Sequence, residues 1–154
     1  MKTESLPKEK QILDINISES EWEVMRVLWA EAPLTSREII DRVLQVVDWK
    51  EGTVKSLINR LTSKAQIRKI KTDTVLRYEP TLKENYANTI KLDRTMSVVC
   101  TKERGNLISH LIENNDISKK DIKALIKQLN EKLVDAPDVV ECRCLLGQCH
   151  CHLH

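Results

Sequence analysis

Four cysteines stand within ten positions near the C-terminus of this chain of 154 residues. They form two Cys-x-Cys pairs, which are separated by a short segment that contains Gly147. A flexible backbone with a glycine turn lets thiols at such spacings converge on one centre. Four thiolates make a soft, tetrahedral donor set that binds Zn(II) or Cu(I) in preference to calcium or magnesium. The sequence therefore predicts a metal site formed by Cys142, Cys144, Cys149 and Cys151.

The same cysteines could instead form disulfides in a secreted protein. The first residues, from Met1 to Lys10, contain no apolar run of the kind that a signal peptide or membrane anchor needs. We therefore expect a reducing compartment, in which thiols stay available to metals. His150, His152 and His154 are interleaved with or follow the second pair, and the pattern leaves open whether they assist.

A second group of residues is basic. Between Lys50 and Arg77 the chain carries eight lysines and arginines against two acidic residues, although its formal net charge is only +2. Such a local concentration of positive charge indicates a surface that binds phosphate. For any single lysine, a solvated helix face is the alternative interpretation.

The elements that must position these residues begin with clear helix signals. Ser18 with Glu21, and Thr35 with Glu38, have the spacing of capping boxes. They open predicted helices over 19–31 and from about position 36, and a third helix is predicted over 53–64. The predicted buried faces are Trp22, Val24, Met25, Leu28 and Trp29, then Ile39, Ile40, Val43, Leu44 and Val47, then Val54, Leu57, Ile58 and Leu61.

The hydrophobic period then changes from that of a helix to that of a strand. Ile67 and Ile70 on one side, and Val75 and Tyr78 on the other, flank Thr72-Asp73-Thr74, which predicts a hairpin of two short strands. Three helices followed by a hairpin predict a winged helix, whose third helix usually reads the major groove. An exposed face with no partner is the alternative. The polar residues on that helix that could contact phosphates or base edges are Thr53, Lys55, Ser56, Asn59 and Arg60.

Two more helices are predicted beyond Pro80, over 83–111 and 119–134. Their apolar residues exceed what two isolated helices can bury, so we expect a second copy of the chain to cover them. Cys100 falls within this apolar stripe and is interpreted as a core cysteine rather than a ligand. The predicted fold is thus mostly α with a small β-hairpin. Its parts are a mobile arm (1–16), a winged helix-turn-helix DNA-binding domain (17–80), a helical dimerisation region (81–136) and a metal-binding tail (137–154).

Three segments of the predicted DNA-binding domain carry a family resemblance: 17–29 (ISESEWEVMRVLW), 34–39 (LTSREI) and 49–61 (WKEGTVKSLINRL). They resemble the penicillinase-repressor family, closely over 17–80 and in outline over 81–135. The tail resembles the Cys-x-Cys-x4-Cys-x-Cys signature of the copper branch of that family, the CopY-type repressors. The resemblance implies a homodimeric bacterial repressor of copper-efflux genes. In such proteins the zinc form holds a palindromic operator, and Cu(I) displaces zinc and releases the DNA.

The resemblance also implies roles for particular residues and partners. It implies that the metal ligands are Cys142, Cys144, Cys149 and Cys151. It also implies that the helix that reads DNA carries Thr53, Lys55, Ser56, Asn59 and Arg60. Zn(II) would be the cofactor of the repressing form, Cu(I) the inducer, and a copper chaperone a candidate Cu(I) donor. The partners would be double-stranded DNA and a second copy, in the cytoplasm and without a membrane.

Other classes of function fit parts of the chain. The β-lactam-responsive members of the family are cleaved at an Asn-Phe bond, but this chain contains no Phe and has Asn106-Leu107 at about the corresponding place. A metal-storage or chaperone module would need the tail and no winged helix. A hydrolytic metalloenzyme needs an open coordination position and a general base, and four thiolates without a neighbouring carboxylate motif provide neither. We therefore expect a regulator and not an enzyme.

Overall fold

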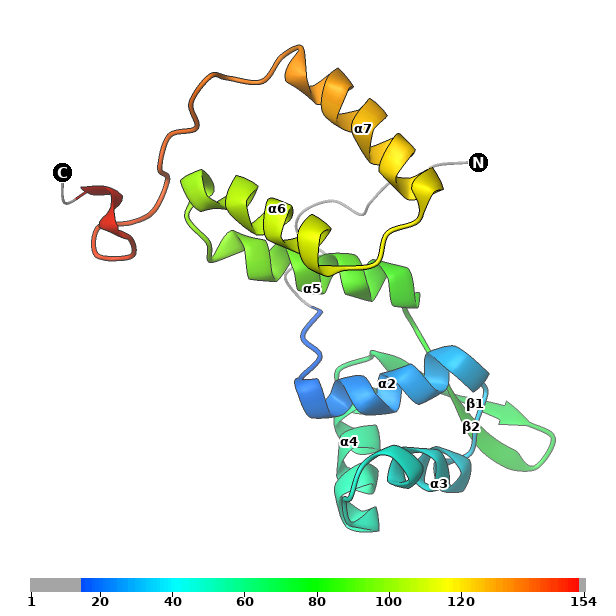
Figure 1. Cartoon of the computed structure of the whole chain (residues 1–154). Helices are drawn as coiled ribbons and strands as arrows, with labels where there is room; N and C mark the ends of the chain where they lie inside the picture. Colours follow the sequence, from blue (N-terminus) through cyan, green and yellow to red (C-terminus); the bar gives the residue numbers. More distant parts are fainter. Residues whose placement is uncertain (1–14, 153–154) are drawn as a thin grey trace. The chain divides into compact units, whose positions relative to one another are not determined.

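The computed structural model describes residues 15–152 of a chain that divides into two compact units, Met1–Leu92 and Asp93–His154. The predicted mobile arm lies almost wholly outside the described residues. The fold is mostly helical with one small hairpin, as the sequence predicted (Figure 1). No helix in the described part of the chain is long and apolar enough to cross a membrane.

The first unit begins with three helices: α2 (Glu19–Glu31), α3 (Ser36–Val46) and α4 (Glu51–Ser63). Both predicted capping boxes are confirmed. The hydroxyls of Ser18 and Thr35 accept the N–H groups of Glu21 and Glu38, whose carboxylates accept the N–H groups of the two cap residues. These reciprocal bonds satisfy backbone donors that a helix start otherwise leaves unpaired. The helix α4 starts a little earlier than predicted, after an extended Lys50 that makes no side-chain cap.

The predicted hairpin is present and is attached to the helices. Strands β1 (Ile67–Thr72) and β2 (Val75–Pro80) pair antiparallel, with Thr72 opposite Val75. Asp73 at the turn has a φ of 55°, a left-handed conformation that aspartate tolerates better than most residues. Leu34, just before α3, exchanges two backbone hydrogen bonds with Tyr78, at 3.1 and 2.7 Å. The hairpin is therefore fixed to the α2–α3 connection, which gives the winged-helix arrangement.

The core of this unit lies between the three helices and the hairpin. Four predicted core residues differ from expectation, because Trp22, Trp29, Leu44 and Val47 are only half-buried. Trp22 and Trp29 stack edge to face with ring centroids 5.2 Å apart. Trp29 directs its indole N–H to the carbonyl of Leu82 at 2.9 Å, which explains why its ring stays at the edge of the core. The buried core residues are Val24, Met25, Leu28, Leu34, Ile39, Ile40, Val43, Val54, Leu57, Ile58, Leu61, Ile67 and Tyr78.

The prediction of one helix over 83–111 is wrong. The structure has α5 (Glu84–Ser97), a short 3-10 helix η1 (Thr101–Glu103) and α6 (Arg104–Asn114) in its place. The break contains Val98, Val99 and Thr101. These β-branched residues lose side-chain freedom in a helix and lower its stability there. The break takes Cys100 out of helical structure.

The second unit then continues with α6 and α7 (Lys119–Leu133), and α7 starts after Ser118, whose hydroxyl accepts the N–H of Asp121. Neither helix contains a buried residue within the described chain. Apart from the half-buried Leu125, their leucine and isoleucine side chains, which the sequence placed in a stripe, are exposed, from 37% for Leu107 to 72% for Leu133. A single copy of the chain therefore leaves this surface uncovered.

Candidate metal centre and nucleic-acid interface

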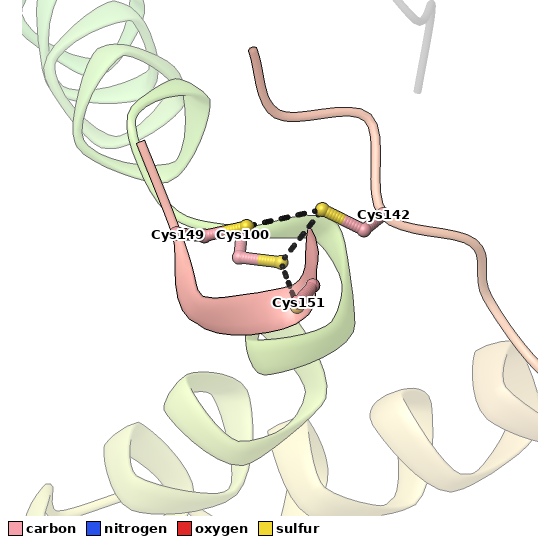
Figure 2. Close-up of side chains that lie close together, drawn as sticks. All are labelled: Cys100, Cys142, Cys149 and Cys151. Atoms are coloured by element: carbon pink, nitrogen blue, oxygen red, sulfur yellow. Dashed lines mark hydrogen bonds between the residues drawn. The ribbon is translucent and has the colours of Figure 1, made fainter. Parts of the chain in front are cut away.

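Four cysteine sulfurs meet in the second unit (Figure 2). The sulfur atoms of Cys100, Cys142, Cys149 and Cys151 all lie within 4.8 Å of one another. Cys100 Sγ is 3.6 Å from Cys142 Sγ and 3.6 Å from Cys151 Sγ, and Cys142 Sγ is 3.3 Å from Cys149 Sγ. All four residues are half-buried, and none forms a disulfide. The arrangement thus presents four thiols that are not in disulfides to a common centre.

Two segments far apart in the sequence form this cluster. Cys100 is the residue that precedes η1, in the break between α5 and α6. Beside it, the hydroxyl of Thr101 donates to the carbonyl of Glu141 at 2.6 Å and joins the break to the tail. In the tail, Gly147 has a φ of 85°, and the N–H of Gln148 bonds to Leu145 O at 3.1 Å. The predicted glycine turn is confirmed, and it returns the chain so that the second Cys-x-Cys pair faces the first.

The cluster has the dimensions that a tetrahedral metal ion requires. Zinc bound to sulfur at about 2.3 Å places its four ligand atoms about 3.8 Å apart. Three sulfur–sulfur distances in the cluster, two at 3.6 Å and one at 3.3 Å, are close to that value. Soft thiolates select zinc or copper over calcium or magnesium. The described residues therefore fit a metal ion of this class.

Cys144, the remaining predicted ligand, is near the cluster but is not one of the four mutually close sulfurs. Its backbone N–H donates to Cys142 Sγ at 3.5 Å, a contact that would stabilise a thiolate on Cys142. Burial, and hydrogen bonds of its own thiol with those of Cys142 and Cys149, raise the pKa of Cys144 to about 12. The tail thus contributes a fifth thiol to the same neighbourhood.

The pKa values of Cys151 and Cys149 are shifted in opposite directions. Hydrogen bonds with Cys100 and Cys149 raise the pKa of Cys151 to about 12. The pKa of Cys149 is lowered, because it accepts the backbone N–H of Cys151 and a hydrogen bond from Cys142. Of Cys144, Cys149 and Cys151, Cys149 therefore loses its proton first. Binding of a metal ion must displace the remaining protons.

The neighbourhood of the cluster is open to solvent on the side of Cys144. A hollow of about 440 Å³ lies there, bordered by the α5–α6 break and the tail turn. His150 is exposed, His154 lies outside the described residues, and the placement of the His152 side chain is likewise not described. The residues that line the hollow are Ser97, Val98, Val99, Thr101, Arg104, Arg143, Cys144, Leu145 and Gln148.

The position of Cys100 differs from the sequence prediction. It was expected in the apolar stripe, yet it is half-buried among sulfurs. The expectation failed because a helix was assumed to run through this position. The signal that could have located it is the β-branched pair Val98-Val99, which favours a break two residues before Cys100.

The second candidate surface is α4 in the first unit. All five residues predicted to face DNA are exposed on this helix, on the side opposite its buried residues. Lys55 pairs with Glu51 at 3.0 Å, and Arg60 pairs with Glu21 at 3.2 Å. On the wing, Lys69 and Lys71 of β1 are exposed as well. The structure thus places polar and basic side chains on both the helix and the hairpin.

Sequence reasoning missed the role of Glu21. Its side chain has no exposed surface, and besides its capping bond it contacts the ammonium of Lys64 at 2.8 Å. Burial alone would raise the pKa of Glu21, but the hydrogen bonds from Lys64 and Ser18 and the charge of Arg60 outweigh it and lower the pKa. One buried carboxylate therefore holds two basic residues at the C-terminal end of α4.

Known proteins resemble this chain over most of its length. The family model described as penicillinase repressor matches residues 17–131. An uncharacterized 16.5 kDa protein of Latilactobacillus sakei is 33% identical over 135 residues, which are 88% of this chain and 92% of that protein. The methicillin resistance regulatory protein MecI of Staphylococcus aureus (strain N315) is 29% identical over 119 residues, 75% of this chain and 94% of that protein.

Among solved structures, monomeric BlaI of Bacillus licheniformis in complex with the blaP half-operator matches with a TM-score of 0.43 and 28% identity, over 47% of this chain and 88% of that chain. The family match covers the greater part of the chain and ends before the cysteine tail. The chain therefore belongs to the penicillinase repressor family of transcriptional repressors, and it is not an enzyme.

Proposed function

We propose that this protein is a metal-responsive repressor of copper-homeostasis genes, which holds a palindromic operator in its zinc form and releases it when Cu(I) displaces zinc. The observation that carries the proposal is the presence of two sites in one chain. The first unit is a winged helix with an exposed polar α4, and the second contains a thiol cluster of metal-site dimensions. A cytoplasmic location follows from action on chromosomal DNA.

The DNA-binding part of the proposal rests on α4 and the wing. Thr53, Ser56 and Asn59 offer hydroxyl and amide groups for base edges or phosphates, and Lys55 and Arg60 offer charge. Lys69 and Lys71 on the hairpin add positive charge that could contact the phosphates of the DNA beside the groove. The family relative MecI is named as a regulatory protein, which agrees with this use of the domain.

The proposal of a palindromic operator requires a homodimer, and the exposed faces of α6 and α7 support one. Each helix exposes apolar side chains and buries none within the described chain. The occupant that fits such a face is a second copy of the same helices, because a homodimer pairs identical apolar surfaces. Two copies would present two α4 helices to half-sites about one helical turn, ~34 Å, apart.

The release step is a change of geometry rather than of charge. One Zn(II) on four thiolates and two Cu(I) on four thiolates carry the same net charge, so repulsion from DNA does not distinguish the two forms. Zn(II) favours one closed tetrahedron of four sulfurs, whereas the soft Cu(I) ion is well served by thiolates in other arrangements. The sulfurs of the cluster must then regroup. A coupling of about 1–3 kcal/mol between the metal site and the DNA site is typical of such switches.

A gel-shift titration with the full-length protein tests this proposal. The zinc form should shift a palindromic duplex, Cu(I) delivered as a buffered complex should release it, and equal additions of Mg(II) should not. Cys149→Ser should bind zinc weakly and respond poorly to Cu(I), while His150→Ala, an adjacent residue with an exposed side chain, serves as the matched control. If Cu(I) left the zinc complex on the DNA, the copper response would be refuted, and the assignment to the repressor family would stand.

A further inference from the structure

Cys100 is absent from the tail motif, yet its sulfur lies inside the cluster. It is 3.6 Å from Cys142 Sγ and 3.6 Å from Cys151 Sγ, distances similar to the 3.3 Å that separates Cys142 Sγ from Cys149 Sγ. Figure 2 shows its side chain directed toward the tail sulfurs from the chain segment between α5 and α6. Core packing does not account for this position, since Cys100 is half-buried and its sulfur contacts those of Cys142 and Cys151.

The neighbourhood contains five thiols, whereas a closed zinc site takes four. The four sulfurs that lie mutually within 4.8 Å are those of Cys100, Cys142, Cys149 and Cys151. We propose that Cys100 is a metal ligand and completes the zinc site with these three tail cysteines, leaving Cys144 as a fifth thiol at the edge of the site. Each ligand thiol passes its proton to water as its sulfur binds the ion. The inference rests on the proposed function only in requiring that the cluster binds a metal.

The segment that carries Cys100 is already held against the tail without a metal. Thr101, the next residue, donates a hydrogen bond to Glu141 O at 2.6 Å, directly before Cys142. Arg104 Nε bonds to Val99 O at 3.3 Å and supports the bend on the other side of Cys100. These contacts lower the entropy that ordering the ligands would otherwise cost, which favours Cys100 as a ligand.

If Cys100 is a ligand, the metal ion links the tail to the segment before α6, which a site made by the tail motif alone cannot do. Cys100 and Cys142 are 42 residues apart, and the chain between them contains α6 and α7. A link through the metal would enclose both helices in one closed loop and restrict their freedom. A site made by the tail alone would close only a short loop outside the helices. The metal centre would thus act directly on the segment that carries the exposed apolar faces.

Zinc affinity of the full-length chain, measured in competition with a chromophoric chelator, tests the assignment. Cys100→Ser should weaken Zn(II) binding as strongly as Cys142→Ser does, by more than about a hundredfold, since even residues that merely support metal ligands cost about 10- to 100-fold. Val98→Ser places the same side chain in the same break without removing a thiol, and it should keep the affinity of the unmodified chain. Thermal melts of the metal-free proteins check that each variant folds.

The outcomes separate the two proposals. If Cys142→Ser lost affinity and Cys100→Ser kept it, Cys100 would not be a ligand, and the proposed function would stand. If neither substitution changed the affinity, the cluster would not be a zinc site, and both proposals would fall. A folded Cys100→Ser that bound zinc as weakly as Cys142→Ser would support the assignment.

Alkylation of the unmodified protein gives a second measurement, which does not depend on any variant folding. Metal-bound thiolates react slowly, so zinc should slow the iodoacetamide labelling of Cys100 as much as that of Cys142, and a chelator should restore both rates. Labelling of Cys100 at the same rate with and without zinc, while Cys142 was protected, would overturn the inference.

Discussion

The carboxylate of Glu21 lies 2.8 Å from the ammonium of Lys64, and this contact joins the first turn of α2 to the C-terminal end of α4. Glu21 also accepts the N–H of Ser18 and pairs with Arg60 at 3.2 Å, so all three partners converge on one fully buried side chain. A buried carboxylate persists only when it is paired and hydrogen-bonded. The residue therefore both caps α2 and fixes the orientation of the proposed reading helix.

Glu21→Gln should lower the free energy of unfolding by about 1–3 kcal/mol, the usual cost of losing a buried hydrogen bond to a charged group. Urea denaturation followed by circular dichroism measures it. Glu51→Gln is the matched control, since Glu51 pairs with Lys55 and Arg37 on an exposed surface, where such pairs are worth about 0–1 kcal/mol. Equal losses in the two variants would contradict the structural role of Glu21.

The same residue predicts a dependence of stability on pH. Its pKa is lowered in the folded chain from an ordinary value of 4.5, so its contribution is present above that value and is lost as the pH falls through the folded pKa. The difference in unfolding free energy between the unmodified protein and Glu21→Gln should therefore be constant near neutral pH and shrink below 4.5. A difference that grew on acidification would show the opposite sign of the pKa shift.

Lys55→Ala should weaken operator binding and leave the thermal melt nearly unchanged, because Lys55 is exposed and its ion pair with Glu51 lies on the surface. If it contacts a phosphate, the slope of log affinity against log salt should fall by about one unit per protomer. Arg60 is a poorer probe, since its substitution also removes a partner of Glu21.

Lys123→Ala is the control for Lys55→Ala. It removes an equal charge from an exposed position on α7, in the second unit. Fluorescence anisotropy on a palindromic duplex at several salt concentrations compares the two variants. Unchanged affinity and salt slope in Lys55→Ala would remove this residue from the proposed DNA contacts.

Ile126→Glu should prevent dimer formation. Ile126 is 54% exposed on the apolar face of α7, and a glutamate there would have to be buried without a partner when two copies associate. Sedimentation should show a dissociation constant raised by more than about tenfold, equivalent to about 1.4 kcal/mol. Val46→Glu, at an apolar position that is 71% exposed on α3, should sediment like the unmodified protein. If Ile126→Glu remained a dimer, this face would not be the interface.

Local signals in the sequence predicted the helices and the hairpin of the first unit. The capping boxes of α2 and α3 and the helical spacing of apolar residues such as Leu57 and Leu61 act over three or four positions, so they can be recognised without knowledge of the fold. The change of hydrophobic period near Ile67 predicted the hairpin for the same reason. The sequence also predicted the tail as a thiol site, since its four cysteines are adjacent along the chain.

Tertiary structure alone decided which distant residues meet. Lys64 reaches Glu21 across 43 positions, and Cys100 reaches Cys142 across 42. The residues next to each partner in the sequence do not reveal the other partner. Both contacts depend on where helices end and where the chain bends between the two residues. In the second unit, the break after α5 determined the position of Cys100. Once Val98 and Val99 ended the helix, Cys100 was placed at the tail, and a thiol expected in an apolar stripe became a neighbour of the metal-site cysteines.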